Sequence, residues 1–157
     1  MNIKVISIGK TNKSYLVEGE QEYLKRLKKY VSFEKVEIPD IKGAKKMSQK
    51  EIKQKEGQLL LSKMQPTDFV ILLDDKGKMR SSVEFSNWLQ SKMNLSIKTM
   101  AFVIGGAYGF SDEVYARGQE KISLSKMTFS HQMIRMLFFE QIYRAFSILN
   151  NEPYHHE

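Results

Sequence analysis

The sequence has no cysteine among its 157 residues. This absence excludes a disulfide framework and any metal site built from thiolates. Long apolar runs are also absent, since no segment approaches the roughly 20 apolar residues that a membrane helix needs. The apolar start of the chain is interrupted by Gly9 and Lys10 and is too short for a signal peptide. We expect a cytoplasmic protein that contacts neither a membrane nor a metal.

Acidic residues are fewer than basic ones: the sequence has 18 aspartates and glutamates against 25 lysines and arginines, which gives a net charge of +7. Such an excess favours polyanionic partners, and nucleic acid first among them. A solvated lysine surface explains the composition equally well. Much of the excess is local, in residues 25–29 and 42–55. No long basic tail is present, so any RNA footprint is expected on the folded surface.

Linkers, internal repeats and low-complexity segments are missing too, which predicts a single domain over residues 1–157. What the chain does contain is an alternation of strand and helix patterns. Apolar, largely β-branched runs predict strands at 3–8, 33–38, 69–73, 100–104 and 121–125. Helical spacing and capping residues predict helices at 13–30, 48–64, 81–93, 111–117 and 131–149. This order indicates an α/β fold with a mainly parallel sheet and helices on both faces.

Two elements of the alternation, the third strand and the last helix, have unusual composition. The run at 69–73 is continuously apolar, as in a parallel strand covered on both faces, and it is expected to end in a turn at Asp74–Gly77. The last helix is apolar around much of its circumference. We expect a subunit interface to cover what the sheet leaves exposed, and the alternative is a helix enclosed within one subunit.

Three unusual segments follow predicted strands, where ligands of open parallel sheets bind. They are residues 73–75 (Leu-Asp-Asp), 105–109 (Gly-Gly-Ala-Tyr-Gly) and 125–129 (Ser-Lys-Met-Thr-Phe). The glycines do not form the dinucleotide fingerprint, and Gly9-Lys10 lacks the upstream glycine of a phosphate-binding loop. A nucleotide-binding oxidoreductase or a flavodoxin-like domain is therefore disfavoured. The convergence of the three segments predicts one ligand site.

Four blocks of sequence make the prediction specific: residues 103–109, 124–132, 140–145 and 153–155. Together they resemble the ribosomal RNA large subunit methyltransferase H family, and the similarity extends from the first strand to the tail. One departure is Ser130, at a position where members often carry proline. The resemblance implies the SPOUT superfamily, with a trefoil knot in the C-terminal part that no residue pattern would predict. It also implies a homodimer.

The same resemblance implies S-adenosylmethionine as methyl donor and N3 of a pseudouridine in large-subunit rRNA as acceptor. By position, the residues that it assigns to the donor are Leu73, Gly105 with its neighbour Gly106, Ser123, Leu124, Ser125, Lys126, Met127 and Thr128. Backbone groups of a tight loop can read the polar edge of adenine, while Leu73 and Met127 offer apolar contact. Methyl transfer needs mainly positioning and charge control, and no metal.

The acceptor nitrogen is a weakly acidic imide that must lose its proton, and the resulting negative charge needs a partner. Only three histidines, at positions 131, 155 and 156, limit the candidates for a base near neutral pH. His155 is the first choice, against the alternative of a frayed terminal residue. His131 is the weaker candidate and is expected to cap or orient the last helix.

Two further side chains complete the predicted catalytic set. Arg144 lies on an otherwise apolar helix and needs an anion, which is either RNA phosphate or the developing charge on the base. The alternative for Arg144 is a salt bridge between subunits, with Glu140 or Glu113. Tyr154 is expected to stack on the base, unless it is an interface aromatic.

The substrate is expected to be folded ribosomal RNA in an assembled large subunit or ribosome. Phosphate attraction carries no sequence information, and one small domain has no separate RNA-binding module. A partner subunit's residues 25–29 would then dock the RNA. The competing hypothesis is an RNA-binding protein of the same fold without catalysis, which the intact Gly105, Gly106 and His155 disfavour.

Overall fold

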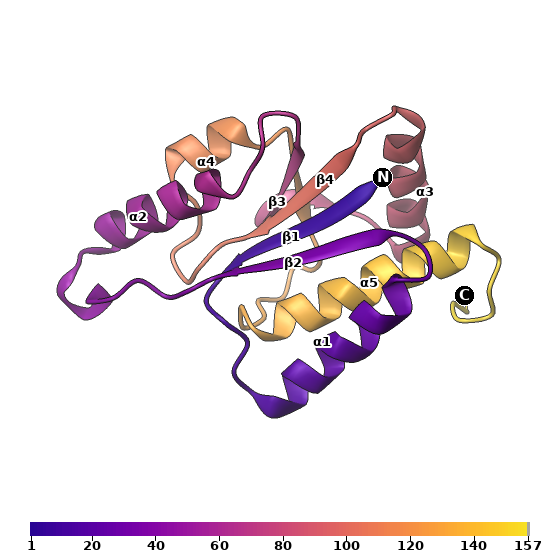
Figure 1. Ribbon diagram of the computed structural model, residues 1–157, viewed down its shortest axis with the longest axis horizontal. Coiled ribbons are helices and arrows are strands. Elements are labelled where there is room, and N and C mark those ends of the chain that lie inside the picture. Colours follow the sequence, from indigo (N-terminus) through magenta and orange to yellow (C-terminus); the bar gives the residue numbers. More distant parts are fainter. Residues whose placement is uncertain (157) are drawn as a thin grey trace.

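The computed structural model describes residues 1–156 and consists of one five-stranded sheet between two layers of helices (Figure 1). In chain order the elements are β1 (Asn2–Ile8), α1 (Ser14–Leu27), β2 (Ser32–Ile38), η1 (Ala44–Lys46), α2 (Gln49–Ser62), β3 (Phe69–Met79), α3 (Ser82–Asn94), β4 (Thr99–Ile104), α4 (Asp112–Arg117), β5 (Glu120–Ser123) and α5 (Met133–Leu149). The strand order is β2-β1-β4-β3-β5, and every pairing is parallel. The predicted α/β class and parallel sheet are confirmed.

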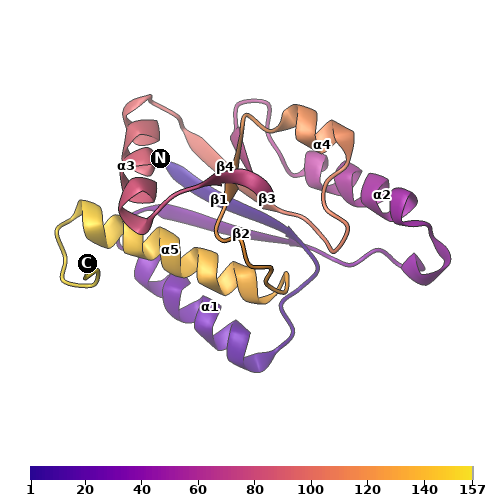
Figure 2. The same cartoon turned by 180° about the vertical axis from the view of Figure 1, so that it is seen from behind.

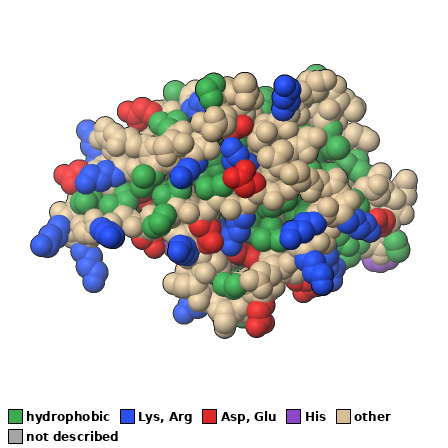
Figure 3. Space-filling view, viewed as in Figure 1, with side chains coloured by type: hydrophobic (Ala, Val, Ile, Leu, Met, Phe, Trp, Pro, Cys, Tyr) green, Lys and Arg blue, Asp and Glu red, His purple; other side chains and the backbone are tan. Residues whose placement is uncertain are grey.

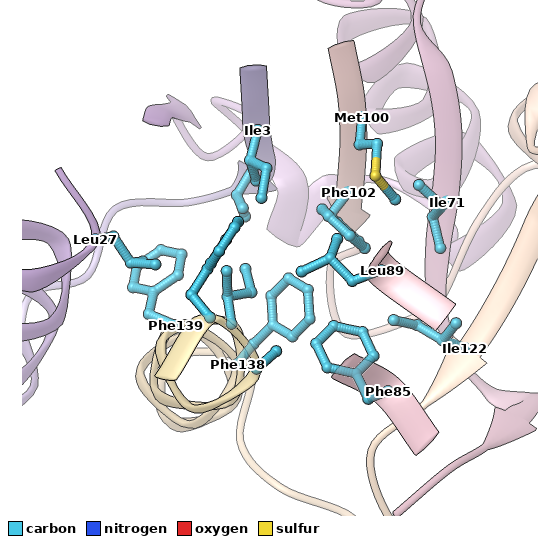
Figure 4. Close-up of a cluster of buried hydrophobic side chains, with 14 of the residues drawn as sticks. Ile3, Leu27, Ile71, Phe85, Leu89, Met100, Phe102, Ile122, Phe138 and Phe139 are labelled. Atoms are coloured by element: carbon cyan, nitrogen blue, oxygen red, sulfur yellow. The ribbon is translucent and has the colours of Figure 1, made fainter. Parts of the chain in front are cut away.

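Helices cover both faces of the sheet, as the continuous apolar strands require (Figures 1 and 2). On one face α1, α5 and α3 pack over a large apolar cluster. Figure 4 shows its centre, where Phe138 of α5 meets Phe102 of β4 and Leu89 of α3, and Phe139 lies toward Leu27 of α1. On the other face α2 and α4 cover a smaller cluster that contains Leu60, Val114 and Phe110.

Local sequence signals set most of the helix starts. Ser81 accepts a hydrogen bond from the Glu84 backbone while the Glu84 side chain accepts one from the Ser81 backbone, which is the predicted capping box of α3. Ser48 accepts the backbone N–H of Glu51 at the start of α2. Ser111 caps the start of α4, where its side chain accepts the backbone N–H of Val114.

The third strand does not end where the sequence predicted. Asp74 Oδ1 accepts the backbone N–H of Lys76 at 2.8 Å, so the expected turn chemistry is present. The chain nevertheless continues as strand to Met79, because β5 pairs with it on both sides of a register shift: Ile122 aligns with Leu73 and again with Lys78. The turn prediction is therefore wrong, and a bulged segment inside β3 takes its place.

Smaller corrections concern helix faces and ends. Leu59 and Met93, which the apolar helical spacing of their segments would place on buried faces, are each 39% exposed. In α2 the buried face instead contains Glu56, Gly57 and Leu60. The last strand ends at Ser123 rather than residue 125, and the last helix begins at Met133 rather than residue 131. Helical spacing alone does not say which neighbour packs against which face.

The apolar last helix is largely enclosed within one subunit. It lies between α1 and α3 on the sheet (Figure 2), and Phe138, Phe139 and Ile142 are each 0% exposed. Its first turn is tied to the end of β1, where the buried Arg135 donates to the carbonyls of Gly9, at 2.7 Å, and Ile8. The alternative of enclosure within one subunit thus accounts for most of the apolar surface of α5. Among residues 1–156, no helix has the length and apolar character needed to cross a membrane.

Candidate active site at the carboxyl ends of the strands

The three segments that the sequence singled out lie side by side. Leu73 of β3 pairs with Ile104 of β4 on one side and with Ile122 of β5 on the other. Gly105 directly follows β4, and Ser123 is the last residue of β5. Parallel pairing therefore places all three at one edge of the sheet, where ligands bind in folds of this class.

A cavity of about 410 Å³ opens beside the end of β5. We call it the first cavity. Of the predicted donor-binding residues, only Ser123, Leu124 and Ser125 line it, and Gly106 lines a different cavity. Phe129, in the loop after β5, also lines it. The other walls come from the end of β3, the start of α3 and one side of α5, through residues that include Lys78, Phe85 and Gln141.

The loop after β5 is shaped by its own serines. Ser123 Oγ donates to the Ser125 carbonyl at 3.0 Å, and the Met127 backbone N–H donates to Ser125 Oγ at 2.9 Å. Met127 is 77% exposed. Within residues 1–156, the backbone groups of Lys126 and Thr128 take part in none of the chain's own hydrogen bonds. This loop offers unused polar backbone next to exposed apolar side chains.

The two adjacent glycines are explained by contacts inside the chain. A β-carbon on Gly105 would lie 3.0 Å from the ring of Phe110, and one on Gly106 would lie 2.5 Å from Oε2 of Glu56. Close packing against these two side chains therefore favours glycine at both positions. A bulky residue at Gly105 would first displace Phe110, a buried core residue.

Two basic side chains at the end of β3 line the first cavity, and the sequence analysis did not predict them there. Lys78 and Arg80 line it because β3 runs past the expected turn. Arg80 lies over the Trp88 ring at 4.9 Å, and its Nη1 is buried without a hydrogen-bond partner among the described residues. The signal was available in the sequence: Lys76, Lys78 and Arg80 alternate with the period of a strand.

A polar cluster joins the end of α5 to the tail. Arg144 donates to Glu140 Oε1 through Nε at 3.0 Å and through Nη2 at 2.5 Å. Tyr154 donates its hydroxyl to the same oxygen at 3.0 Å, and the guanidinium lies 4.6 Å from the Tyr154 ring centroid. His155 Nδ1 lies 3.1 Å from Arg144 Nη1. Since Glu140 also lines the first cavity, this cluster borders the cavity.

The cluster corrects one expectation about Arg144. Its salt bridge to Glu140 joins residues four apart on one helix, not two subunits. The hydrogen bond that Arg144 donates to Glu140 is the main cause that raises the pKa of Arg144. The pKa of Tyr154 is also raised, by burial first, then by hydrogen bonds with Tyr23 and Glu140. Both groups therefore keep their protons at neutral pH.

The contact with Arg144 sets the hydrogen-bonding role of one ring nitrogen of His155. A guanidinium has donors only, so Nδ1 of His155 accepts from Arg144.

His131 does not have the role in the helix that the sequence suggested. Ser130 Oγ accepts the backbone N–H of Met133 at 3.2 Å, and the Ser130 carbonyl accepts that of Ile134. The residue at the helix boundary, Gln132, makes no side-chain cap. His131 is exposed and lines a different cavity. Throughout residues 1–156 no group of three or more acidic or histidine side chains is arranged to hold a metal ion.

Comparison with known proteins supplies the remaining findings. A family model described as "Predicted SPOUT methyltransferase" matches residues 1–155. The chain is 57% identical to "Ribosomal RNA large subunit methyltransferase H" of Parabacteroides distasonis and 58% identical to that of Flavobacterium psychrophilum, over 100% of both chains in each case. The protein of that name from Porphyromonas gingivalis strain W83 is 50% identical over 157 residues.

A solved structure with a similar fold is "a probable methylase family protein from Haemophilus influenzae Rd KW20". The match has a TM-score of 0.54 and 10% identity, over 99% of this chain and 70% of the other. At that identity the likeness concerns the fold alone.

Proposed function

The chain belongs to the SPOUT methyltransferase family, and from that premise we propose that it transfers a methyl group from S-adenosylmethionine to N3 of a pseudouridine in large-subunit ribosomal RNA. The observation that carries the proposal is end-to-end identity of 57–58% with proteins named as methyltransferases of that RNA. The arrangement of side chains around the first cavity supports it.

The residues at the carboxyl edge fit the donor. Adenine needs polar backbone groups for its edge and apolar surface for its faces, and the loop of Lys126, Met127 and Thr128 offers both. Ser123, Leu124 and Ser125 line the cavity beside it. The amino-acid carboxylate of the donor can be met by Arg80, whose Nη1 is buried and unpaired among the described residues. The donor supplies an electrophilic methyl group on a positively charged sulfur.

The cluster at the end of α5 fits the acceptor. Loss of the imide proton leaves negative charge on the base, which a guanidinium stabilises. Arg144 provides that group, Glu140 anchors it, and His155 lies against it. We keep His155 as the group that removes the imide proton. We further propose that Tyr154, whose hydroxyl is held by the same Glu140 oxygen, stacks on the base.

The substrate form is part of the proposal. The predicted acceptor nitrogen is hidden in a stacked base, so the base must be extruded. A single small domain with charge +7 attracts phosphates but does not select one nucleotide among thousands. We infer that an assembled large subunit or ribosome supplies the missing shape, and that the protein acts as a homodimer in the cytoplasm.

Mass spectrometry of ribosomal RNA from cells with and without this protein tests the reaction. We expect one methylated pseudouridine to disappear with the protein. Purified protein with labelled donor is then offered a short hairpin, naked rRNA, large subunits and ribosomes. Transfer should be at least tenfold faster on an assembled particle. Unchanged modification in the cells would contradict the proposed activity, and equal transfer to the hairpin would contradict the need for an assembled particle.

A further inference from the structure

A second cavity, of about 280 Å³, lies at a different part of the same sheet edge. Its lining includes Ile8 at the end of β1 and Gly106 just beyond β4, two neighbouring strands. The helices that follow these strands, α1 and α4, lie on opposite faces of the sheet (Figures 1 and 2). Crevices at such a reversal are where open α/β sheets bind ligands. No lining residue is shared with the first cavity.

A buried carboxyl group forms part of this second cavity. Glu56 of α2 is 7% exposed, and its Oε1 is buried with no hydrogen-bond partner among the described residues. The carboxylate packs so closely on Gly106 that a β-carbon there would lie 2.5 Å from Oε2. An acceptor left unpaired in the interior is costly, and a ligand N–H would satisfy it. The pKa of Glu56 is raised, by burial first and by the charge of Asp40 second.

The surroundings of Glu56 are suited to RNA rather than to a cation. Tyr108 is 43% exposed and lines the cavity, where its ring can stack on a base. Asp40, Lys45 and His131 also line it, so one lysine and one histidine accompany the two carboxyl groups. Further exposed lysines stand on η1, just before it and at the start of α2, where blue side chains gather at one end of the molecule in Figure 3; they are Lys42, Lys46 and Lys50. Such charges attract phosphates next to the cavity and repel metal ions.

We propose that the second cavity binds an unstacked nucleobase with a ring N–H, guanine before uracil, in the RNA substrate. Glu56 accepts the ring N–H, Tyr108 stacks on the base, and Lys45 meets a flanking phosphate. Guanine fits best because its N1–H and amino group offer two donors to the two carboxylate oxygens. The inference rests on the proposed function in that the ligand is RNA, and it adds a recognition subsite separate from the place of methyl transfer.

Nucleoside 5′-monophosphates test the pocket directly. Each of the four is titrated into the full chain while the NMR signals of Gly106, Tyr108 and His131 are followed. We expect GMP to bind at least fivefold more tightly than AMP or CMP, with UMP between. Glu56→Gln should weaken GMP binding about tenfold and leave donor affinity unchanged by calorimetry. Glu51→Gln is the matched control, because it removes one charge from the same helix outside the cavity.

Several outcomes would overturn the pocket assignment. Equal binding of all four nucleotides would indicate a site for phosphate only. NMR shifts confined to residues of the first cavity would place the nucleotide there. Shifts that depend on protein concentration instead of nucleotide concentration would indicate that a second copy of the chain covers the second cavity. If Glu56→Gln fails to fold, Tyr108→Ala takes its place, with the same loss of GMP binding expected.

A second measurement links the pocket to catalysis. In methyl transfer to large subunits, Glu56→Gln should raise KM about tenfold with kcat nearly unchanged, since the residue would bind RNA away from the reacting atoms. An unchanged KM would count against a role in RNA recognition. Should the native protein methylate no ribosomal particle, the proposed function fails, whereas the nucleotide titration still decides whether the pocket binds a base.

Discussion

At the scale of single residues, Glu140 has the most connected side chain of the candidate active site. One of its oxygens accepts from both Arg144 and Tyr154, and Arg144 in turn contacts His155. The tail is thus held to α5 through one carboxylate. Removing that carboxylate should disturb all three partners while leaving the apolar core beneath them in place.

We predict that Glu140→Gln lowers methyl transfer at least tenfold and lowers the pKa of Tyr154. The carboxylate favours the protonated phenol, so its loss lets Tyr154 ionise at lower pH. An absorbance titration of phenolate between pH 9 and 13 measures the change. Tyr115, whose pKa is raised to about 12 by burial and by Asp74, should titrate as before. An unchanged titration curve would contradict the assigned contact.

Glu56 predicts a pH-dependent stability. The pKa of Glu56 in the folded protein lies above the ordinary value of 4.5, because burial disfavours the charged carboxylate. The stabilising contribution of the protonated group is therefore complete below pH 4.5 and is lost as the pH rises through the folded pKa. Glu56→Gln cannot ionise and should avoid this loss.

Urea unfolding of both proteins at pH 4.5 and pH 8 measures the effect of Glu56. The variant should gain stability relative to the native chain on going to pH 8, and Glu51→Gln should follow the native chain. If the free energy of unfolding differs between variant and native chain by the same amount at both pH values, Glu56 does not bury a charge in the folded protein.

At the scale of elements, the start of α3 sets the shape of the first cavity. The capping box of Ser81 and Glu84 fixes the corner at which β3 ends and α3 begins. Arg80 stands next to that corner, and Ser81, Ser82 and Phe85 line the cavity. The cap therefore links helix stability to the position of the cationic side chain.

Ser81→Ala should destabilise the protein by about 1 kcal/mol, the usual cost of losing such a cap. Donor affinity should fall as well, because the corner that carries Arg80 loosens. Chemical denaturation and calorimetry give the two values. Gln90→Ala, an exposed position on the same helix, should change neither. If Ser81→Ala is destabilised but binds the donor with normal affinity, the helix cap does not control the position of Arg80.

At the scale of the whole molecule, we predict that a second subunit packs on the side of α5 that the core leaves accessible. The core side of α5 is covered by the sheet, α1 and α3. Beside the first cavity, partly exposed apolar surface remains on Ile134 and Leu137 of α5 and on the 37% exposed Phe129. A dimer formed there would close the cavity and exclude water from it.

We predict a dimer in light scattering at micromolar protein, and a monomer for Leu137→Glu because the new charge would be buried in the interface. Leu95→Glu is the matched control, since Leu95 is 67% exposed at the end of α3 and lies away from the cavity. A monomeric native protein would refute the homodimer, and a dimeric Leu137→Glu would place the interface elsewhere.

Much of this protein is determined by its sequence alone. The apolar runs of β1, β3 and β4, the capping serines 48, 81 and 111, and the spacing of the helices give the α/β class, because these signals are local. The four sequence blocks identified the family, which the full-length relatives confirm. The knot, the donor-binding residues and the catalytic residues stay predictions.

Tertiary structure decided what depends on contacts between distant segments. Pairing with β5 extended β3 beyond its turn and brought Arg80 to the first cavity, and the packing of α2 on Gly106 buried Glu56. The Arg144–Glu140 pair joins neighbours on one helix, yet only the fold brings His155 and Tyr154 against it. Local patterns report the face and the period of an element, whereas the free energy of burial and pairing is set by partners far away in the chain.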